Sequence, residues 1–124
     1  MILSIIIPVY NEESTVIKVL EKVKNNSSNL FEYEIIVIDD GSTDRSRKLL
    51  ENNKHLYSKL LVNETNRGKG FAVKKGILNS TGTHIIFQDA DFEYDPTDFK
   101  KFECSEKLII LSFRKKYFQR DSIT

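Results

Sequence analysis

The sequence predicts one small α/β domain built on a mostly parallel sheet. Short apolar runs that resemble strands alternate with segments whose apolar residues recur at helical spacing, and the order repeats three times before a fourth strand. Such alternation is typical of parallel sheets with right-handed crossovers. Polar residues stand directly after the strands, at the sheet edge where ligands bind in such folds.

Four apolar runs carry the strand prediction. Residues 2–9 form an almost continuous apolar run, ended by Pro8 and a polar cluster, which is typical of a strand buried on both faces. Residues 34–38 and 84–87 have the same character, and residues 59–63 form a shorter strand between them. These four runs therefore supply a central sheet.

Three helices are predicted between these strands. Their apolar residues recur every three or four positions, as in a helix that buries one face. Polar residues before the first two helices can start or cap them. The predicted helices run from 11–14 through Val23, from 42–44 to about His55, and over 71–78, with a polar break at 25–29 and a loop at 66–70.

Composition fits a soluble globular protein of 124 residues, with 40% hydrophobic and 30% charged residues. The net charge of +1 gives no strong attraction to nucleic acid, which is not an expected partner. Cys104 is the single cysteine, so no internal disulfide can form, in agreement with a reducing compartment. The apolar start lacks the basic region of a signal peptide, and no stretch is long enough to cross a bilayer, so a cytoplasmic location is expected.

Acidic clusters follow three of the four predicted strands. The first strand runs into residues 10–12, the second into Asp39 and Asp40, and the fourth into Asp89 and Asp91. Alone, the first two clusters are more simply a turn or a helix cap, and any exposed loop can hold two aspartates such as Asp89 and Asp91. Because the carboxyl ends of parallel strands meet at one sheet edge, the three clusters together indicate a ligand site.

The spacing of Asp89 and Asp91 suits a diphosphate held through a divalent metal ion. Carboxylates repel a diphosphate unless a hard cation lies between them, and Mg²⁺ or Mn²⁺ takes oxygen ligands while keeping positions open for phosphates. Such an ion stabilises a leaving diphosphate. Glu93 can supply a third oxygen, whereas Asp95, before Pro96, more simply starts a turn.

Four segments of the chain resemble the family 2 glycosyltransferases. Residues 5–12 (IIIPVYNE) look like the start of that family, and residues 35–44 (IIVIDDGSTD) match its second strand. Residues 66–70 (NRGKG), with Gly76 after them, match the start of its next helix. Residues 88–96 (QDADFEYDP) resemble the metal motif of the dolichol- and polyprenyl-phosphate sugar transferase branch.

This resemblance covers residues 2 to about 102 and implies a GT-A fold, a Rossmann-like sheet with flanking helices. It implies inverting, metal-dependent transfer of a sugar from a UDP- or GDP-linked donor to a polyprenyl phosphate or a glycan. Asp39 is expected to be a nearby, secondary contact of the donor. The implied donor-binding residues are Pro8, Tyr10, Glu12, Ile38, Asp40, Asp89, Ala90 and Asp91, and the implied ligands of Mg²⁺ or Mn²⁺ are Asp89, Asp91 and Glu93.

The resemblance ends after Phe102. We therefore predict a nucleotide-sugar-binding half domain over residues 1–102 and a divergent tail over 103–124, in a chain truncated or frame-shifted after the metal motif. Residues 108–113 can form a strand or a short helix. The rest of the tail is basic and carries aromatic residues. A solvated terminus is the simpler interpretation of this composition. The sharper one is a weak contact at the cytoplasmic face of a membrane, where a lipid phosphate acceptor would lie.

No catalytic base is assigned, because the acceptor-binding groups of the family lie largely beyond the metal motif. Donor binding with little or no transfer is expected of this chain alone, so a non-catalytic nucleotide-binding remnant is the alternative to an enzyme. An Asp-x-Asp phosphatase would carry its motif on the first strand, with Thr or Val in place of Glu93. A dinucleotide-dependent dehydrogenase would carry Gly-x-Gly-x-x-Gly after the first strand, and this chain does not.

Lys69 is expected to be a solvated lysine rather than a phosphate clamp, since its loop is not a Walker A motif. The sequence leaves the donor base, the sugar, the acceptor and the oligomeric state open.

Overall fold

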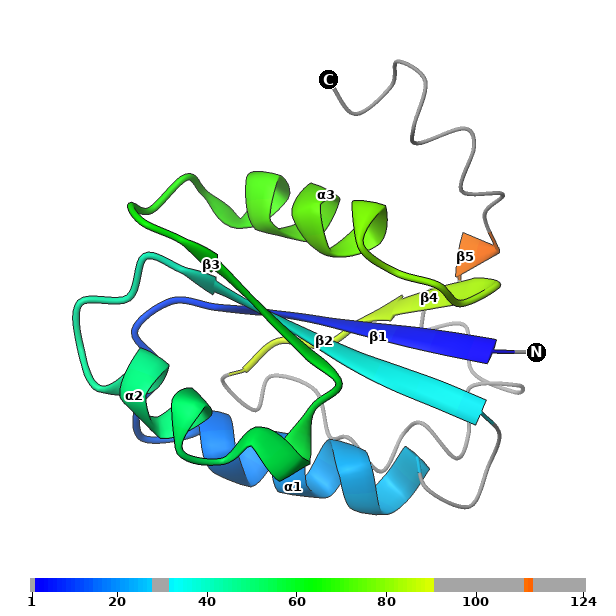
Figure 1. The fold of residues 1–124 in the computed structure, drawn as a ribbon, viewed down its shortest axis with the longest axis horizontal. Helices are drawn as coiled ribbons and strands as arrows, with labels where there is room; N and C mark the ends of the chain where they lie inside the picture. The colour runs from blue at the N-terminus through cyan, green and yellow to red at the C-terminus, as the bar shows by residue number, and fades with distance from the viewer. Residues whose placement is uncertain (1, 28–31, 91–110, 113–124) are drawn as a thin grey trace.

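The computed structural model describes residues 2–27, 32–90 and 111–112. These residues form one sheet with helices on both faces (Figure 1). The elements are β1 (Ile2–Val9), α1 (Val16–Ser27), β2 (Glu32–Asp40), α2 (Ser46–Glu51), the 3-10 helix η1 (Lys54–Leu56), β3 (Lys59–Asn63), α3 (Lys69–Leu78), β4 (His84–Phe87) and β5 (Leu111–Ser112). The strand order is β3-β2-β1-β4-β5, and all neighbours are parallel except β4 and β5.

Strand β1 lies inside the sheet and is buried on both faces. Ile5 is in register with Ile35 of β2 and Ile86 of β4. Ile5 and Ile7 belong to the core cluster that includes residues of α1 and α2, whereas Ile6 belongs to the cluster that includes residues of α3. A strand buried on both faces favours apolar residues at successive positions, which explains the almost continuous apolar sequence of β1.

Helix α3 covers one face of the sheet, and α1 and α2 cover the other (Figure 1). Gly76 sets how closely α3 approaches the sheet. A Cβ atom at this position would lie 2.7 Å from Cγ2 of Ile6 and 2.8 Å from Cδ1 of Ile38. Since real Cβ contacts are longer than this, a larger residue would push α3 away from β1 and β2.

Most of the predicted elements are confirmed. The strands predicted over 2–9, 59–63 and 84–87 have these bounds in the structure, and the strand predicted over 34–38 is longer at both ends. Helix α1 continues to Ser27, past the start of the predicted polar break, and α3 begins two residues earlier than predicted. A helix tolerates polar residues on its exposed face, so the asparagines near its end did not stop α1.

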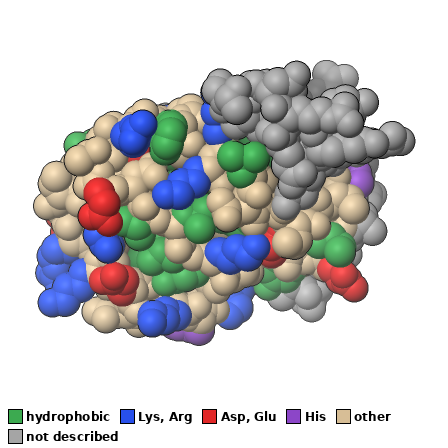
Figure 2. All heavy atoms as spheres, turned by 45° about the horizontal axis from the view of Figure 1, so that its top comes forward, with side chains coloured by type: hydrophobic (Ala, Val, Ile, Leu, Met, Phe, Trp, Pro, Cys, Tyr) green, Lys and Arg blue, Asp and Glu red, His purple; other side chains and the backbone are tan. Residues whose placement is uncertain are grey.

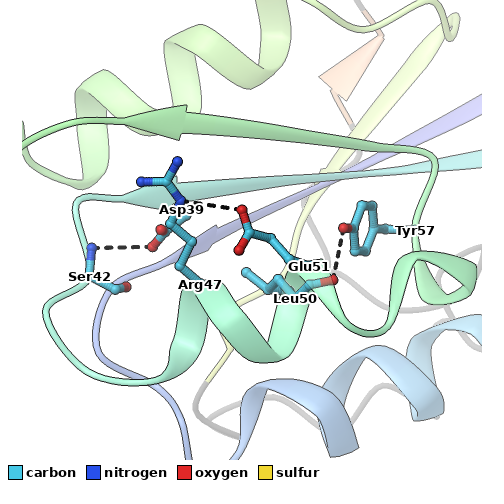
Figure 3. Close-up of polar contacts among 6 residues, drawn as sticks. All are labelled: Asp39, Ser42, Arg47, Leu50, Glu51 and Tyr57. Carbon is cyan, nitrogen blue, oxygen red and sulfur yellow. Dashed lines mark hydrogen bonds and ion pairs between the residues drawn. The ribbon is translucent and has the colours of Figure 1, made fainter.

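The second predicted helix, to about His55, is wrong in length. Helix α2 ends at Glu51, and η1 is a separate turn. Two side chains bind the last carbonyl groups of α2. Nδ2 of Asn53 donates to the carbonyl of Leu49 at 2.7 Å. The Tyr57 hydroxyl donates to the carbonyl of Leu50 at 2.9 Å (Figure 3). Because side chains satisfy these carbonyls, the chain can leave the helix there.

Strand β5 makes the sheet mixed, with His84 in antiparallel register with Ser112. The element predicted over 108–113 is therefore a strand at the two residues that the structure describes. The other residues of 103–124 lie outside the described part, so the division at residue 102 stays a prediction. In the described ranges no helix is both long and apolar enough to span a bilayer.

Candidate functional site

The carboxyl ends of β1, β2 and β4 meet at one edge of the sheet and line a cleft of about 320 Å³. The loop before α3 closes the same cleft from the side. The three polar clusters that the sequence places after the strands are thus brought together. The residues that line the cleft are Pro8, Val9, Tyr10, Glu12, Asp40, Asn66, Gly68, Lys69, Asp89 and Ala90.

Most of the predicted donor-binding residues line this cleft: Pro8, Tyr10, Glu12, Asp40, Asp89 and Ala90. The side chain of Ile38 is instead fully buried in the core cluster beside α3. It supports Asp40, two residues further along the same strand face. Asp91 and Glu93 lie outside the described residues, so their roles stay predictions.

The loop after β1 is tied to the loop after β2 by Asn11. The side-chain Oδ1 of Asn11 accepts hydrogen bonds from the backbone N–H groups of Thr43 at 2.7 Å and Asp44 at 3.2 Å, and its own N–H donates to Oγ of Ser42 at 3.0 Å. Asn11 has a positive φ of 52°, a conformation that asparagine tolerates better than most residues. Tyr10, which precedes it, is 44% exposed and lines the cleft.

A threonine links the first and last clusters of the site. The hydroxyl of Thr15 donates to the carbonyl of Ala90 at 2.6 Å and lies 3.3 Å from Oε2 of Glu12. The N–H of Glu12 donates to Oγ of Ser46 at 2.8 Å. Thr15 and Ser46 thus position Ala90 and Glu12. Neither Thr15 nor Ser46 is predicted as a site residue, because Ala90 and Glu12, their respective partners, are distant in the chain.

Asp40 binds the loop that precedes α3. Its Oδ1 accepts hydrogen bonds from Nδ2 of Asn63 and the N–H of Arg67, and its Oδ2 accepts one from the N–H of Gly68, all at 2.9 Å. Asp40 is 3% exposed. Gly68 has φ of 96°, which glycine adopts without a steric penalty. Asp40 therefore fixes the wall of the cleft to the end of β2.

Asp39, the secondary contact expected from the sequence, is also buried and does not line the cleft. Its Oδ1 accepts a hydrogen bond from the N–H of Ser42 at 3.3 Å (Figure 3). Its Oδ2 has no hydrogen-bond partner within the ranges the structure describes. A buried carboxylate oxygen without a partner is costly, so this atom has capacity to accept a hydrogen bond.

Asp89 forms an ion pair with Lys69 across the cleft. The Lys69 side chain is 65% exposed and that of Asp89 is 16% exposed. Lys69 is thus exposed, as expected, but it is paired as well as solvated. Helix α3 begins at Lys69, two residues earlier than predicted, and the side chain of this first residue reaches Asp89, which follows β4.

The chemistry of Asp89 suits a hard divalent cation, because a carboxylate that is partly exposed in the cleft can present an oxygen ligand. Within residues 2–27, 32–90 and 111–112, no three His, Cys, Asp or Glu side chains are grouped so that they could hold a metal ion. The two other predicted ligands, Asp91 and Glu93, lie beyond these ranges.

Comparison with known proteins assigns this chain to a family. A sequence model described as Glycosyl transferase family 2 matches residues 4–102. The dolichyl-phosphate beta-glucosyltransferase of Dictyostelium discoideum is 40% identical in an alignment of 117 positions, gaps included, that covers 86% of this chain and 35% of that protein. The enzyme of the same name from Homo sapiens is 35% identical in an alignment of 112 positions that covers 82% of this chain and 34% of that protein. The chain thus spans about a third of the length of these relatives.

Solved structures agree in fold. The S. aureus protein TarS (residues 1–349), in complex with UDP, superposes with a TM-score of 0.71 at 26% identity and is matched over 83% of this chain and 31% of its own. The mannosyltransferase PcManGT from Pyrobaculum calidifontis, in complex with GDP-Man and Mn²⁺, gives a TM-score of 0.65 at 26% identity, over 77% of this chain and 29% of its own. The predicted resemblance and the predicted GT-A fold are both confirmed: this chain belongs to glycosyl transferase family 2.

Proposed function

We propose that this domain binds a nucleoside diphosphate sugar in the cleft, as the donor half of a protein that transfers the sugar to a polyprenyl phosphate. The observation that carries the proposal is the meeting of Tyr10, Asp40 and Asp89, from three separate strand ends, in one cleft. The names of the relatives, dolichyl-phosphate beta-glucosyltransferases, support the acceptor class. Because the chain spans about a third of their length, transfer is proposed for the whole protein.

The nucleoside would bind at the end of the cleft formed by Pro8 and Tyr10. The exposed ring of Tyr10 offers an aromatic face on which a base can stack. Glu12 offers a carboxylate for the polar edge of the base or the ribose. A carboxylate has roughly four acceptor positions, and Asp40 uses three of them on the chain itself, so it has little capacity left for the ligand.

The diphosphate would bind at the other end, beside Asp89. We propose Asp89, Asp91 and Glu93 as the ligands of Mg²⁺ or Mn²⁺; a neighbour in the comparison, PcManGT, is solved with Mn²⁺. An ion held by these residues would neutralise the negative charge of the diphosphate as it leaves during inverting transfer. Lys69 adds a second positive charge at the same end of the cleft, and Gln88 holds the turn, since its Nε2 donates to the carbonyl of Asp89 at 3.0 Å.

A thermal-shift titration of the purified chain tests the proposal. The titration uses UDP, GDP and their sugars, each with and without Mn²⁺, on the wild-type chain and on Asp89→Asn. Glu51→Gln is the matched control, because Glu51 is an exposed carboxylate on α2 that does not line the cleft. A ligand at about 100 times its Kd stabilises the folded state by roughly 2.7 kcal/mol.

We expect a metal-dependent rise in Tm with one of the two nucleotides, kept in Glu51→Gln and lost in Asp89→Asn. A chain that melts cooperatively but responds to no nucleotide would rule the proposal out. Turnover is a separate measurement: transfer of labelled sugar to polyprenyl phosphate by the full-length protein supports the enzyme, whereas binding without turnover supports the alternative of a nucleotide-binding remnant.

A further inference from the structure

A second and larger hollow lies on the other side of the loop that borders the cleft. Its volume is about 790 Å³, and it is an open groove between β3 and the outer face of α3. It shares no lining residue with the cleft. Arg67 and Gly70 line the groove, while the residues between them, Gly68 and Lys69, line the cleft. The groove therefore adjoins the proposed donor site but is separate from it.

Two large apolar side chains are exposed along this groove. Phe71 is 41% exposed and Leu78 is 42% exposed. They are seven residues apart in α3, about two helical turns, so both lie on the same face of the helix. Figure 2, which shows the molecule turned so that the top of Figure 1 comes forward, has apolar surface there, interspersed with Lys and Arg side chains.

Basic side chains flank these apolar ones. The guanidinium of Arg67 lies 4.5 Å from the centre of the Phe71 ring. Lys74 is exposed and stands three residues after Phe71 and four before Leu78, which places it on the same face. Lys75 has a structural role instead, because its Nζ donates to the carbonyl of Val62 at 3.0 Å and so joins α3 to β3.

We propose that this face of α3 docks on an anionic lipid membrane. Phe71 and Leu78 would enter the boundary between headgroups and acyl chains, and Arg67 and Lys74 would contact the anionic headgroups. Aromatic and aliphatic residues beside cations are the composition of helices that lie in the membrane interface. Long basic side chains can bury their stems and still keep the charge at the headgroups.

Charge complementarity selects this occupant over two others. A second copy of the chain, related by a two-fold axis, would bring the same basic patch of both copies into one interface, and like charges repel across an interface. The end of this chain is basic too: residues 113–124 carry Arg114, Lys115, Lys116 and Arg120 against the single acidic residue Asp121. The groove itself has one acidic lining residue, Glu64, against Arg67, Lys74 and Lys75, among the residues that the structure describes.

Vesicle sedimentation tests the inference without any sugar donor or acceptor, so its outcome is independent of the proposed function. The 124-residue chain is mixed with vesicles of phosphatidylcholine alone, or of phosphatidylcholine with about 30 mol% of the anionic lipid phosphatidylglycerol. The test variant is Arg67→Glu/Lys74→Glu. The control is Lys18→Glu/Lys48→Glu, which makes the same change in net charge on exposed residues of α1 and α2, on the opposite face of the sheet.

We expect the wild type to sediment with the anionic vesicles and not with the zwitterionic ones. A basic residue near an anionic surface strengthens binding about fivefold, so the Arg67→Glu/Lys74→Glu variant should bind about 25-fold more weakly or worse. The control pair should stay within about threefold of the wild type, as expected of charges held away from the surface by more than a Debye length. Phe71→Ser/Leu78→Ser should also weaken binding, with an unchanged circular dichroism spectrum as the check on folding.

Three results would overturn the inference. The first is no binding of the wild type to anionic vesicles. The second is an equal loss in the α3 pair and the control pair, which would assign the binding to net charge or to the basic tail. The third is a wild-type dimer that Phe71→Ser/Leu78→Ser converts to a monomer, because the groove would then be an interface between copies.

Discussion

Asp40 and Asp89 line the same cleft, but the chain holds the two carboxylates differently. Asp40 is 3% exposed and accepts three hydrogen bonds from Asn63 and the loop before α3. The side chain of Asp89 is 16% exposed and pairs with Lys69, whose own side chain is 65% exposed. One carboxylate is bound by two backbone N–H groups and a side-chain amide, and the other by the end of a long and mostly solvated side chain.

This difference separates stability from binding within one site. Hydrogen bonds to a buried charged group contribute roughly 1.5–3 kcal/mol each, and donors left without their acceptor add a further cost. An exposed ion pair contributes about 0–1 kcal/mol. Asp40 is therefore part of the scaffold that shapes the cleft, whereas Asp89 can exchange its partner for a ligand at little cost to the fold.

The largest loss of stability is expected for Asp40→Ala. It leaves the N–H groups of Arg67 and Gly68 and the side chain of Asn63 without their acceptor, and we expect the free energy of unfolding to fall by about 3 kcal/mol. Urea unfolding followed by circular dichroism measures it. Asp40→Asn keeps the shape and one acceptor oxygen, so its loss should be smaller. A loss below about 0.5 kcal/mol in Asp40→Ala would contradict a scaffold role.

Gly41→Ala should follow, because Gly41 joins the same scaffold. Gly41 has φ of 73°, and a Cβ atom there would lie 2.4 Å from the backbone nitrogen of Asn66 and 2.5 Å from the carbonyl carbon of Thr65. Since backbone atoms would have to move, we expect a loss of about 2 kcal/mol in the free energy of unfolding. Gly70→Ala is the matched control: a Cβ atom there meets nothing within 4 Å, and in a helix the change should be neutral or stabilise by up to about 1 kcal/mol. Equal effects of the two substitutions would refute the argument from close packing.

Glu34, at the amino end of the sheet, tests whether the same principle holds outside the cleft. Its Oε2 accepts hydrogen bonds from the Ser4 hydroxyl and the N–H of Thr81, both at 2.6 Å. Burial alone would raise the pKa of Glu34, but these hydrogen bonds and the charge of Lys59 together lower the pKa below its usual value. A carboxylate whose pKa is lower in the folded state stabilises the fold above its unfolded pKa.

That contribution should be lost as the pH falls from about 4.5 through the folded pKa of Glu34. Glu34→Gln should therefore lower the free energy of unfolding at pH 7 by about 1 kcal/mol, a value reduced because the side chain is only half-buried. The difference from the wild type should shrink as the pH is lowered to 3. Thermal unfolding at pH 7, 5 and 3 measures this. A difference that is constant across these pH values would show that the charge of Glu34 is not responsible.

The strands of the sheet could be predicted from the sequence because each cue is local. The almost continuous apolar run of β1 identified an interior strand, and the bounds of β3 and β4 followed from the polar residues on either side. The boundary of α2 could not be predicted, because it depends on Asn53 and Tyr57 reaching back to the last carbonyl groups of the helix. Nothing in the helical spacing of residues 46–55 reports such contacts.

The site could be predicted in outline for the same reason. Strand ends converge in any parallel sheet, so the cleft followed from the topology. The partners inside it did not: Thr15 and Ala90 are 75 residues apart, and Lys69 and Asp89 are 20 apart. Whether a carboxylate such as Asp40 binds its own chain or a ligand depends on which N–H groups the fold brings to it, and the sequence around Asp40 contains no record of Arg67 or Gly68.

The smallest effect on stability is expected for Asp89→Asn, and this variant is the most direct test of the difference between Asp40 and Asp89. Because its partner Lys69 is largely solvated, the free energy of unfolding without ligand should change by less than about 0.5 kcal/mol, and Lys69→Met should behave alike. The double variant should show a coupling between Asp89 and Lys69 of about 0–1 kcal/mol in a double-mutant cycle. If Asp89→Asn destabilises the ligand-free chain as much as Asp40→Ala does, Asp89 also belongs to the scaffold. If it leaves stability unchanged but removes the metal-dependent response to nucleotide, the two carboxylates divide the work of the cleft: Asp40 holds its shape, and Asp89 binds its ligand.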